Sequence, residues 1–519
     1  MHNRRDKGQN TDQGIIISTL NKIEYIGNKL PDPATLFLIL SLITIIASYF
    51  LAKAGVSVTY EGYNAETGKI EEITVEAVNL LSPDGIRYMV TNVVNNFTSF
   101  FPLGTVFTII LGVGVAEGTG FMEALMRKIV AVTPKKAVTA VVVFLGIMSN
   151  IASSTGYVVL VPLGAIVFMA FKRHPIAGLA AAFAGVSGGW SANLLIGSND
   201  PLFAGISTQA AQMIDPSYEV LPVSNWYFMF VSTFLLTIVG TFVTEKIVEP
   251  RLKAFDFTSM ETVEDITVDE KRGMRFAGIA ALIYVILILA LILPENGLLR
   301  NPETGSILNS PFMGGIIIIM MLLFLIPGLF YGIGARVIKS DKDVIALMNK
   351  SISGLASFLV LIFFAAQFTA HFNKSNLGTI ISVSGANFLE SVGFVGLPIV
   401  ISFILLTAFI NIFIAVDSAK WAIMAPIFVP MFMRLGLSPE LTQVAYRIGD
   451  SCTNIIAPLM PFFVLTVAFF QRYDKDAGIG SVISTMLPYS IFFLIGWIGL
   501  FIIWYLLGLP LGPGAPLFY

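Results

Sequence analysis

Apolar segments long enough to cross a lipid bilayer recur along the whole chain, and several carry polar residues in their middle. A spanning helix needs about 20 apolar residues, and only helices or closed barrels satisfy their backbone groups in lipid. Of the 519 residues, 55% are hydrophobic and only 12% are charged, whereas a soluble globular chain is about a quarter charged. The sequence therefore predicts an all-α polytopic membrane protein.

The apolar segments are of two kinds. The uninterrupted ones are residues 34–54, 98–118, 226–246, 275–294, 311–335, 351–371 and 484–508. The interrupted ones are residues 137–172, 176–210, 395–434 and 440–471. Non-helical backbone is tolerated at membrane depth only where protein or water satisfies its polar groups. We therefore expect the interruptions to meet inside the protein.

Basic residues indicate which interrupted segments cross the membrane, because Lys and Arg favour the cytoplasmic side. Lysines precede segment 137–172, and Lys172 and Arg173 end it. With both ends on one side, this segment is predicted to turn back as a re-entrant hairpin. We expect segment 395–434 to form a second hairpin from the opposite face. The remaining segments give about nine transmembrane helices, with the N-terminus inside and the C-terminus outside.

The interrupted segments occur in two matching sets. Ser154 lies eight residues before Pro162, and Ser418 lies eight before Pro426. Each set has the order helix, hairpin, broken helix, helix. The first helix of one set starts outside and that of the other starts inside. Such an inverted-topology repeat is typical of secondary transporters, whose substrate and ion sites lie where the helices break.

The rest of the chain completes the predicted organisation. We expect a cytoplasmic N-terminal segment (1–33), a first membrane half (34–246), a cytoplasmic linker (247–274), scaffold helices (275–350) and a second membrane half (351–519). Within the first half, residues 55–87 alternate in the manner of strands around a turn. They predict a small external hairpin cap.

Few ionisable residues lie deep in the apolar segments. A charge at mid-membrane costs at least about 2.5 kcal/mol on insertion scales, so such a residue usually serves function. These residues are Asp200, Asp417, Lys420, Arg447 and Asp450, with Glu117 near a helix end. Arg447 and Asp450 are three apart on one helical face, so they could instead form a structural pair. Asp200, which precedes Pro201, is either a turn residue at a helix break or a carrier of H+ or Na+.

The predicted tip of the second hairpin combines charge with an aromatic side chain. Asp417 and Ser418 are followed by Lys420 and Trp421. At such a tip, Trp421 could stack on an aromatic substrate ring, while Lys420 or Arg447 binds a carboxylate. Arginine suits this task because its planar fork binds bidentately. The alternative for Trp421 is a tryptophan at the membrane interface.

The predicted tip of the first hairpin is neutral. Asn150, Ser153, Ser154 and Thr155, together with Asn193, offer uncharged oxygens beside helix breaks. Broken helices coordinate Na+ through such groups, which predicts a sodium site at Asn150, Ser154 and Asn193. Alternatively, these side chains cap the hairpin arms. We expect no cofactor besides the coupling ion, H+ or Na+. With three histidines and one cysteine, the sequence shows no metal-binding cluster. It contains no Walker motif, so we do not expect transport driven by ATP.

Three strings of the sequence resemble the AbgT family of p-aminobenzoyl-glutamate transporters. They are residues 187–201, 416–426 and 446–458, and the resemblance covers nearly the whole chain. It implies nine transmembrane helices, two re-entrant hairpins, a bowl-shaped homodimer and ion-coupled transport. Some members import p-aminobenzoyl-glutamate, and others export sulfonamide antimetabolites. The matching motif positions imply functional roles for Asp200, Ser418, Trp421, Arg447, Asp450 and Pro458.

We therefore expect a secondary transporter of the cytoplasmic membrane, with a small aromatic carboxylate as substrate and no nucleic-acid partner, rather than an enzyme. The predicted substrate-binding residues are Asp417, Ser418, Lys420, Trp421, Arg447, Asp450, Asn454 and Pro458. The predicted ion-coupling residues are Asn150, Ser154, Thr155, Asn193 and Asp200.

Three other functions compete with this expectation. A Na+-coupled dicarboxylate symporter could use the same architecture, but a small aliphatic diacid needs no tryptophan platform. An intramembrane aspartyl protease must share one proton between two acids, whereas Arg447 near Asp450 favours an ionised carboxylate. A passive channel predicts flux without ion coupling.

Overall fold

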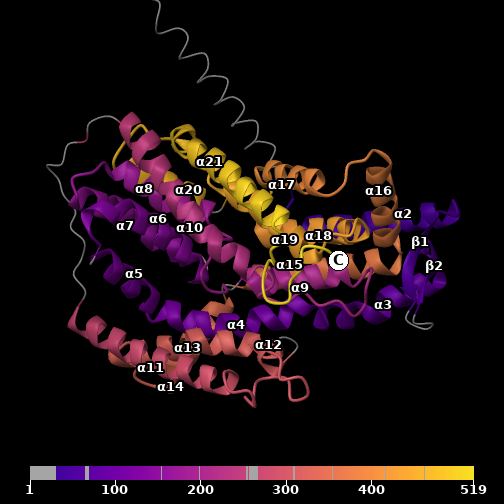
Figure 1. Cartoon of the computed structure of the whole chain (residues 1–519), viewed down its shortest axis with the longest axis horizontal. Coiled ribbons are helices and arrows are strands. Elements are labelled where there is room, and N and C mark those ends of the chain that lie inside the picture. The colour runs from indigo at the N-terminus through magenta and orange to yellow at the C-terminus, as the bar shows by residue number, and fades with distance from the viewer. Residues whose placement is uncertain are drawn as a thin grey trace, which may run out of the picture.

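The computed structural model describes residues 31–64, 69–131, 133–152, 155–197, 199–252, 255, 267–307, 310–353, 355–414, 416–460 and 462–519. Most of these residues are helical (Figure 1). The other residues include most of the predicted N-terminal segment, the turn of the predicted cap and much of the predicted linker. Those parts of the prediction lie outside the described residues.

The first half contains one strand hairpin and a series of helices. Its elements are α2 (Pro33–Lys53), β1 (Ser57–Asn64), β2 (Lys69–Glu76), α3 (Pro83–Thr98), α4 (Phe101–Gly118), α5 (Phe121–Ala131), η1 (Lys135–Ala137), α6 (Val138–Ser149), η2 (Asn150–Ala152), α7 (Thr155–Ala170), α8 (Pro175–Phe183), η3 (Ala184–Gly188), α9 (Asn199–Ala211), α10 (Trp226–Val243), η4 (Thr244–Val248) and η5 (Glu249–Arg251).

Among the described residues, the second half has helices and no named strand. Its elements are α11 (Val268–Ile292), α12 (Pro311–Gly314), α13 (Ile316–Gly334), α14 (Asp341–Ser353), α15 (Ala356–Lys374), α16 (Leu377–Ser391), α17 (Leu397–Asn411), α18 (Asp417–Arg434), α19 (Pro439–Asn454), α20 (Phe463–Gln471) and α21 (Ile479–Leu506).

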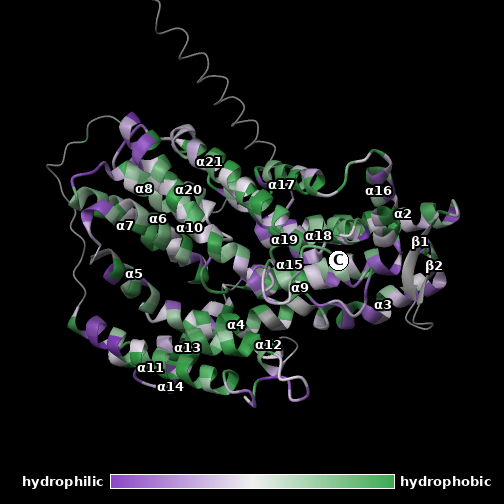
Figure 2. Ribbon diagram, in the orientation of Figure 1, coloured by the Kyte–Doolittle hydropathy of each residue, from purple (hydrophilic) through white to green (hydrophobic). Residues whose placement is uncertain are grey.

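Several helices have the length and composition of membrane spans. Among the described residues these are α2, α10 with η4 and η5, α11, α13 and α21, and the bent pair α4 and α5 would be a sixth. Figure 2 shows long hydrophobic stretches on α11 and α13. On α11, Leu282 and Ile283 are each 61% exposed, which suits contact with lipid. A predominantly helical architecture with several helices able to span a membrane is thus confirmed, while the count of nine transmembrane helices stays a prediction.

The two predicted broken helices are broken in the structure. Segment 176–210 divides into α8, extended by the π-helical turn η3, and α9. Segment 440–471 divides into α19 and α20, and Pro458 lies in the break. In the first break, a Cβ on Gly189 would lie 2.6 Å from the side chain of Ile147. The close approach of α6 therefore requires glycine there.

Each predicted hairpin consists of two short helices. The arms α6 and α7 have 12 and 16 residues and pack against each other. The arms α17 and α18 have 15 and 18 residues. All four are shorter than a helix of about 20 residues, the usual membrane span. Their re-entry into the membrane stays a prediction.

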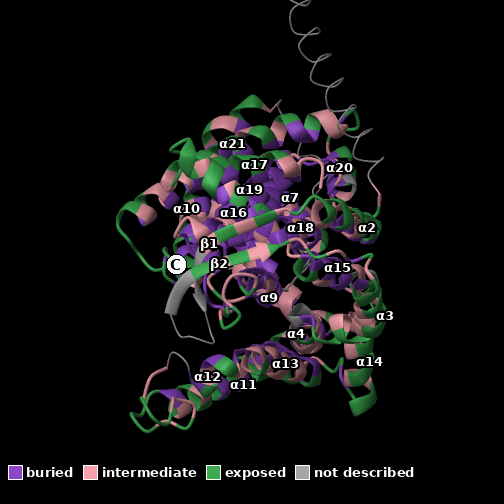
Figure 3. Ribbon diagram, turned by 90° about the vertical axis from the view of Figure 1, so that its right-hand side faces the viewer, coloured by how far each residue is buried: buried purple, intermediate pink, exposed green. Residues whose placement is uncertain are grey.

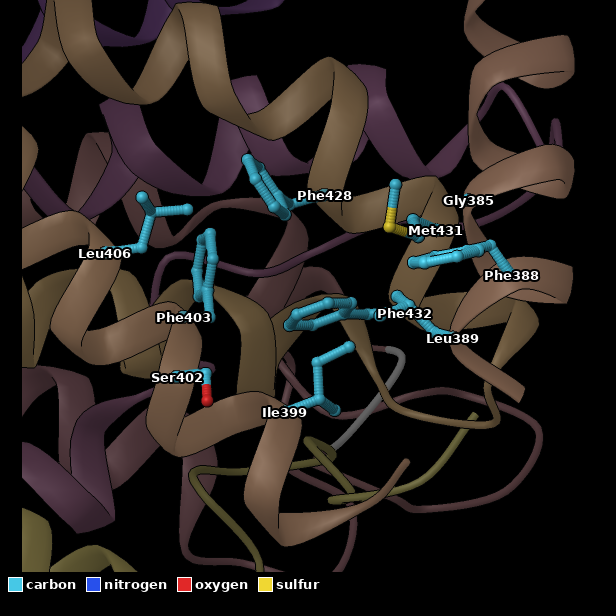
Figure 4. A pocket seen from close by; sticks show the side chains of 10 residues that line it. All are labelled: Gly385, Phe388, Leu389, Ile399, Ser402, Phe403, Leu406, Phe428, Met431 and Phe432. Atoms are coloured by element: carbon cyan, nitrogen blue, oxygen red, sulfur yellow. The ribbon is translucent and has the colours of Figure 1, made fainter. Parts of the chain in front are cut away.

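The arms of the second pair meet through aromatic side chains and leave a cavity between them. Phe403 of α17 lies 4.6 Å from Phe428 and 5.3 Å from Phe432 of α18, measured between ring centroids. These rings line an apolar cavity of about 300 Å³. Phe388 and Leu389 of α16 line it as well (Figure 4). Elsewhere, α17 packs on α19, whereas α18 packs on α9 and α16.

The strand hairpin follows the predicted alternation. Strands β1 and β2 pair antiparallel, with Ser57 opposite Glu76. The side chains of Thr59 and Thr74 are joined by a 2.9 Å hydrogen bond. Helices α3, α5, α14 and α16 lie outside the predicted helical segments. They mix polar and apolar residues, so a search for long apolar runs does not find them.

Candidate functional site

Buried polar side chains gather where α9, α18 and α19 pack together. All 16 residues of α19 are buried, although many of them are polar or charged. In Figure 3 the buried residues concentrate around α7, α18 and α19, while α11 and α13 are far more exposed. Because a buried polar group needs a hydrogen-bond partner, the partners of these side chains define the site.

Lys420 and Asp450 form an ion pair deep in the protein. The Nζ of Lys420 donates to Asp450 Oδ1 at 2.6 Å and also to Asn411 Oδ1. The side chains of Lys420 and Asp450 are 1% and 0% exposed. The amide nitrogen of Asn411 donates to the Asp450 carbonyl oxygen at 2.7 Å and to Asn454 Oδ1 at 2.8 Å. These bonds join both arms of the second pair, α17 and α18, to the broken helix α19.

Arg447 pairs with Asp200, which comes from the other half of the chain. Its Nη2 donates to Asp200 Oδ1, and its Nη1 donates to Asn225 Oδ1 at 3.4 Å. The second carboxylate oxygen of Asp200 accepts the backbone N–H of Gly197 at 2.6 Å. Asp200 therefore has a charged partner in addition to a role in the turn.

The alternative of an Arg447–Asp450 pair is wrong. Each of the two residues forms its ion pair with a residue of another helix, Asp200 for Arg447 and Lys420 for Asp450. Sequence spacing predicts which side chains share a helical face, but it does not show which other elements bring charges to that face.

Asp417 does not pair with Lys420 despite the same spacing. Its Oδ2 accepts the indole N–H of Trp190 at 2.7 Å and the amide of Asn199 at 3.2 Å. Its Oδ1 accepts the backbone N–H of Ser418 at 2.6 Å, and Ser418 is itself buried. The start of α18 therefore contacts the break between α8 and α9.

Trp421 is wholly buried, and one neighbour covers its ring. The ring centroid lies 4.5 Å from that of Tyr446, at an interplanar angle of 33°. Its indole N–H donates to Ser207 Oγ at 3.1 Å. The alternative of a tryptophan at the membrane interface is wrong, because the side chain is 0% exposed. Because the side chain is fully buried, Trp421 can stack on a substrate only after neighbouring side chains, such as Tyr446, move.

A hydrogen-bonded chain connects Trp421 to Arg447. Ser207 donates to Gln443 Oε1 at 2.6 Å, and Gln443 donates to Asn225 Oδ1 at 2.7 Å. Asn225 Oδ1 also accepts from Arg447. The sequence did not indicate Ser207, Gln443 or Asn225, because these neutral polar residues form no recognisable motif.

The first predicted tip is only partly described. Ser153 and Ser154, together with the side chain of Thr155, lie outside the described residues. Asn150 is buried, and its amide nitrogen donates to the carbonyl oxygen of Gly189 at 3.3 Å. Asn193 is buried as well.

Several buried oxygens near the first break lack a hydrogen-bond partner within the described part of the chain. They are Asn150 Oδ1, Ser191 Oγ and Asn193 Oδ1. An unsatisfied buried polar group costs about 1–3 kcal/mol, so three of them together call for an explanation. In the same described part, no group of three or more His, Cys, Asp or Glu residues could hold a metal ion.

Comparisons with known proteins place this arrangement in a wider context. Residues 18–519 match the AbgT putative transporter family. The chain is 41% identical over 492 residues to the p-aminobenzoyl-glutamate transport protein of Escherichia coli (strain K12), with 95% of each chain covered.

Two solved structures are similar throughout. The Alcanivorax borkumensis YdaH transporter, described as having an unusual topology, is 42% identical with a TM-score of 0.86, covering 93% of this chain and 100% of that one. Neisseria gonorrhoeae MtrF, described as illuminating a class of antimetabolite efflux pumps, is 49% identical with a TM-score of 0.89, covering 96% and 100%.

Proposed function

The chain belongs to the AbgT family of transporters, and from this membership we propose that it is an ion-coupled secondary transporter. Its proposed cargo is p-aminobenzoyl-glutamate or a related aromatic compound of the folate pathway, and sulfonamide antimetabolites are included. The named relatives support this cargo, because one is a p-aminobenzoyl-glutamate transport protein and another belongs to a class of antimetabolite efflux pumps.

The observation that carries the proposal is the pair of buried ion pairs beside Trp421. Arg447 and Lys420 each hold a carboxylate of the protein, Asp200 and Asp450. p-Aminobenzoyl-glutamate has one aromatic ring and two carboxylates. A substrate carboxylate could replace a protein carboxylate on either cation, and Arg447 suits this exchange because its fork binds bidentately.

Such an exchange would couple cargo to an ion. When substrate displaces Asp200 from Arg447, the freed carboxylate lacks a positive partner in a buried place. An unpaired charge there is costly, so Asp200 would take up H+ or Na+. Transport of cargo and movement of the ion would then depend on each other. In this scheme Asp200 is the ion-coupling residue, while Trp421, Lys420 and Arg447 contact cargo.

The remaining parts of the proposal concern the assembly. We place the protein in the cytoplasmic membrane as a homodimer, with its N-terminus inside and with α6–α7 and α17–α18 as re-entrant hairpins. Ser418, Asn454 and Pro458 belong to the proposed cargo site because they lie on or beside the helix ends that carry the ion pairs.

A Na+-coupled dicarboxylate symporter is the alternative. The covered aromatic pair of Trp421 and Tyr446 favours an aromatic cargo, because flat rings prefer stacked partners. A small aliphatic diacid would use the cations without the rings. Competition for binding between p-aminobenzoyl-glutamate and succinate distinguishes the two cargoes.

Reconstituted flux tests the proposed function. Labelled p-aminobenzoyl-glutamate is added to proteoliposomes with an H+ gradient, a Na+ gradient or neither. We expect accumulation above the external concentration with one gradient and its collapse on adding the matching ionophore. Equilibration at the same rate in all three conditions would indicate a passive channel and overturn the proposal.

A further inference from the structure

The two halves of the chain share one hydrogen bond in matching positions. Asn150 donates from its amide nitrogen to the carbonyl oxygen of Gly189 at 3.3 Å. Asn411 donates in the same way to the carbonyl oxygen of Asp450 at 2.7 Å. In both halves the two residues are 39 positions apart in the chain. The contact therefore aligns Asn150 with Asn411 in the inverted repeat.

The same alignment pairs a second set of asparagines. Asn454 lies 43 positions after Asn411, and Asn193 lies 43 positions after Asn150. In the second repeat both amide oxygens have partners. Asn411 Oδ1 accepts from the Lys420 ammonium, and Asn454 Oδ1 accepts from Asn411 at 2.8 Å. A positive charge thus rests on the amide oxygen of the second repeat.

The first repeat has the oxygens without the charge. Asn150 Oδ1 and Asn193 Oδ1 have no hydrogen-bond partner among the described residues, although these side chains are only 5% and 7% exposed. Ser191 Oγ, on a residue 3% exposed, has none either. Three buried acceptors therefore lie close to one helix break, and the counterparts of the two amides in the other half are satisfied.

In the first repeat a glycine stands at the position that matches Lys420 when each arm is counted back from its proline. Lys420 lies six residues before Pro426, and the residue six before Pro162 is Gly156. A Cβ on Gly156 would lie 2.8 Å from Ser149 Cβ and 3.1 Å from Val186. The packing leaves no room for a side chain, so this position cannot supply a tethered cation.

We propose that the first repeat binds a free sodium ion on Asn150 and Asn193, at the place that matches the Lys420 ammonium of the second repeat. Hard cations take oxygen ligands, and the unpartnered atoms are two amide oxygens and a hydroxyl.

Two carboxylates lie at this break. Asp200 is paired with Arg447, and Asp417 accepts hydrogen bonds from Trp190 and Asn199. The unpartnered oxygens are themselves neutral, which suits a weakly charged, monovalent ion.

A small cavity lies beside Asn193. It is lined by Asn193, Ser191 and Asp200 among others, but not by Asn150, and its volume of about 10 Å³ is room for a single water-sized particle. A Cβ on Gly197 would lie 3.5 Å from the amide nitrogen of Asn193, 3.6 Å from the backbone carbonyl oxygen of Asn150 and 3.7 Å from Asp200 Oδ2. These groups therefore converge on Gly197. A bound water could also donate hydrogen bonds to these oxygens. A cation is favoured because the matching place in the second repeat holds the Lys420 ammonium.

Only the role of the sodium ion in coupling rests on the proposed function. The binding of sodium to Asn150 and Asn193 does not depend on transport. The inference gives the two repeats different tasks. The second repeat carries its own cation, Lys420, and the first takes one from solution. Each protomer should accordingly bind one sodium ion, and removal of the Lys420 ammonium should open a second site on Asn411 and Asp450.

Equilibrium binding of ²²Na+ to the purified full-length protein, without cargo, tests the inference. We expect one Na+ per protomer in the wild type, none in Asn193→Ala and two in Lys420→Met. Asn96→Ala is the matched control. The amide of Asn96 bonds Gln367 at 3.0 Å, away from the helix breaks, so binding should stay at one.

Any of three results would overturn the inference. The wild type binds no Na+, the Asn193→Ala variant still binds Na+, or the Lys420→Met variant binds no second ion. If Asn193→Ala does not elute as a single species, Asn193→Asp replaces it. That variant keeps an oxygen and adds charge, so Na+ binding should persist and Ca2+ should compete more strongly. Loss of Na+ binding in Asn193→Asp would contradict the site.

Failure here differs from failure of the proposed function. Gradient-driven cargo flux in a protein that binds no Na+ would contradict the sodium site and leave transport standing. Na+ binding without gradient-driven flux would contradict coupled transport and leave the site standing.

Discussion

The Lys420–Asp450 pair offers the sharpest test of the packing argument. Both side chains are buried, and the two charged atoms are 2.6 Å apart. In Asp450→Asn the Lys420 ammonium keeps only neutral oxygens around it. Breaking a buried ion pair from one side costs about 3–5 kcal/mol, which corresponds to roughly two to nearly four powers of ten in the unfolding equilibrium constant.

The double variant Lys420→Met/Asp450→Asn should recover much of this loss. It removes both charges, and replacing a buried pair by neutral groups of similar size is often neutral in stability. Asn411 Oδ1 then loses its donor, so a residual destabilisation of about 1–3 kcal/mol should remain. The double variant is therefore expected to be more stable than Asp450→Asn alone.

Reversible unfolding by SDS titration in mixed micelles, followed by tryptophan fluorescence, measures these differences. The control is the exposed pair of Asp84 and Arg87, whose side chains are 91% and 76% exposed. There Asp84→Asn should change the free energy of unfolding by less than about 1 kcal/mol. The reasoning is refuted if Asp450→Asn costs no more than this control, or if the double variant is less stable than the single one.

Three further predictions follow from the site. Trp421→Phe keeps a ring but loses the bond to Ser207, so thermal stability should fall by about 0.5–1.5 kcal/mol while cargo binding by calorimetry persists. Trp421→Ala should abolish binding of aromatic cargo; unchanged p-aminobenzoyl-glutamate affinity would end the stacking hypothesis. Asp200→Asn should abolish gradient-driven accumulation in proteoliposomes while counterflow of cargo continues, and a variant that still accumulates cargo would show that another residue couples the ion.

The sequence predicted best those helices whose length and composition are set by the lipid bilayer. A bilayer requires long apolar helices, so α2, α10, α13 and α21 were predicted close to their observed bounds. The breaks in 176–210 and 440–471 were predictable for the same reason, because glycine, proline and polar residues interrupt an otherwise apolar run. The amphipathic helices α3 and α14 lack that signal.

The sequence did not show which of the buried charged residues form ion pairs with each other. Arg447 and Asp450 share a helix, but Asp200 and Lys420 reach them from separate elements. Only the packing of α9 and α18 against α19 decides between those partners. Asn411 was missed as a site residue, although Asn150, its counterpart in the first half, was predicted. The equal spacing of the two asparagine sets was the signal that could have indicated it.

The central claim is that cargo and ion move together through the buried ion pairs. The most direct test is the steady-state accumulation of labelled p-aminobenzoyl-glutamate in proteoliposomes holding wild type or Arg447→Ala, with H+ and Na+ gradients imposed in turn. One of the two gradients is expected to drive accumulation in the wild type, and neither is expected to do so in Arg447→Ala. Equal accumulation in both proteins, or equilibration without accumulation in the wild type, would contradict the claim.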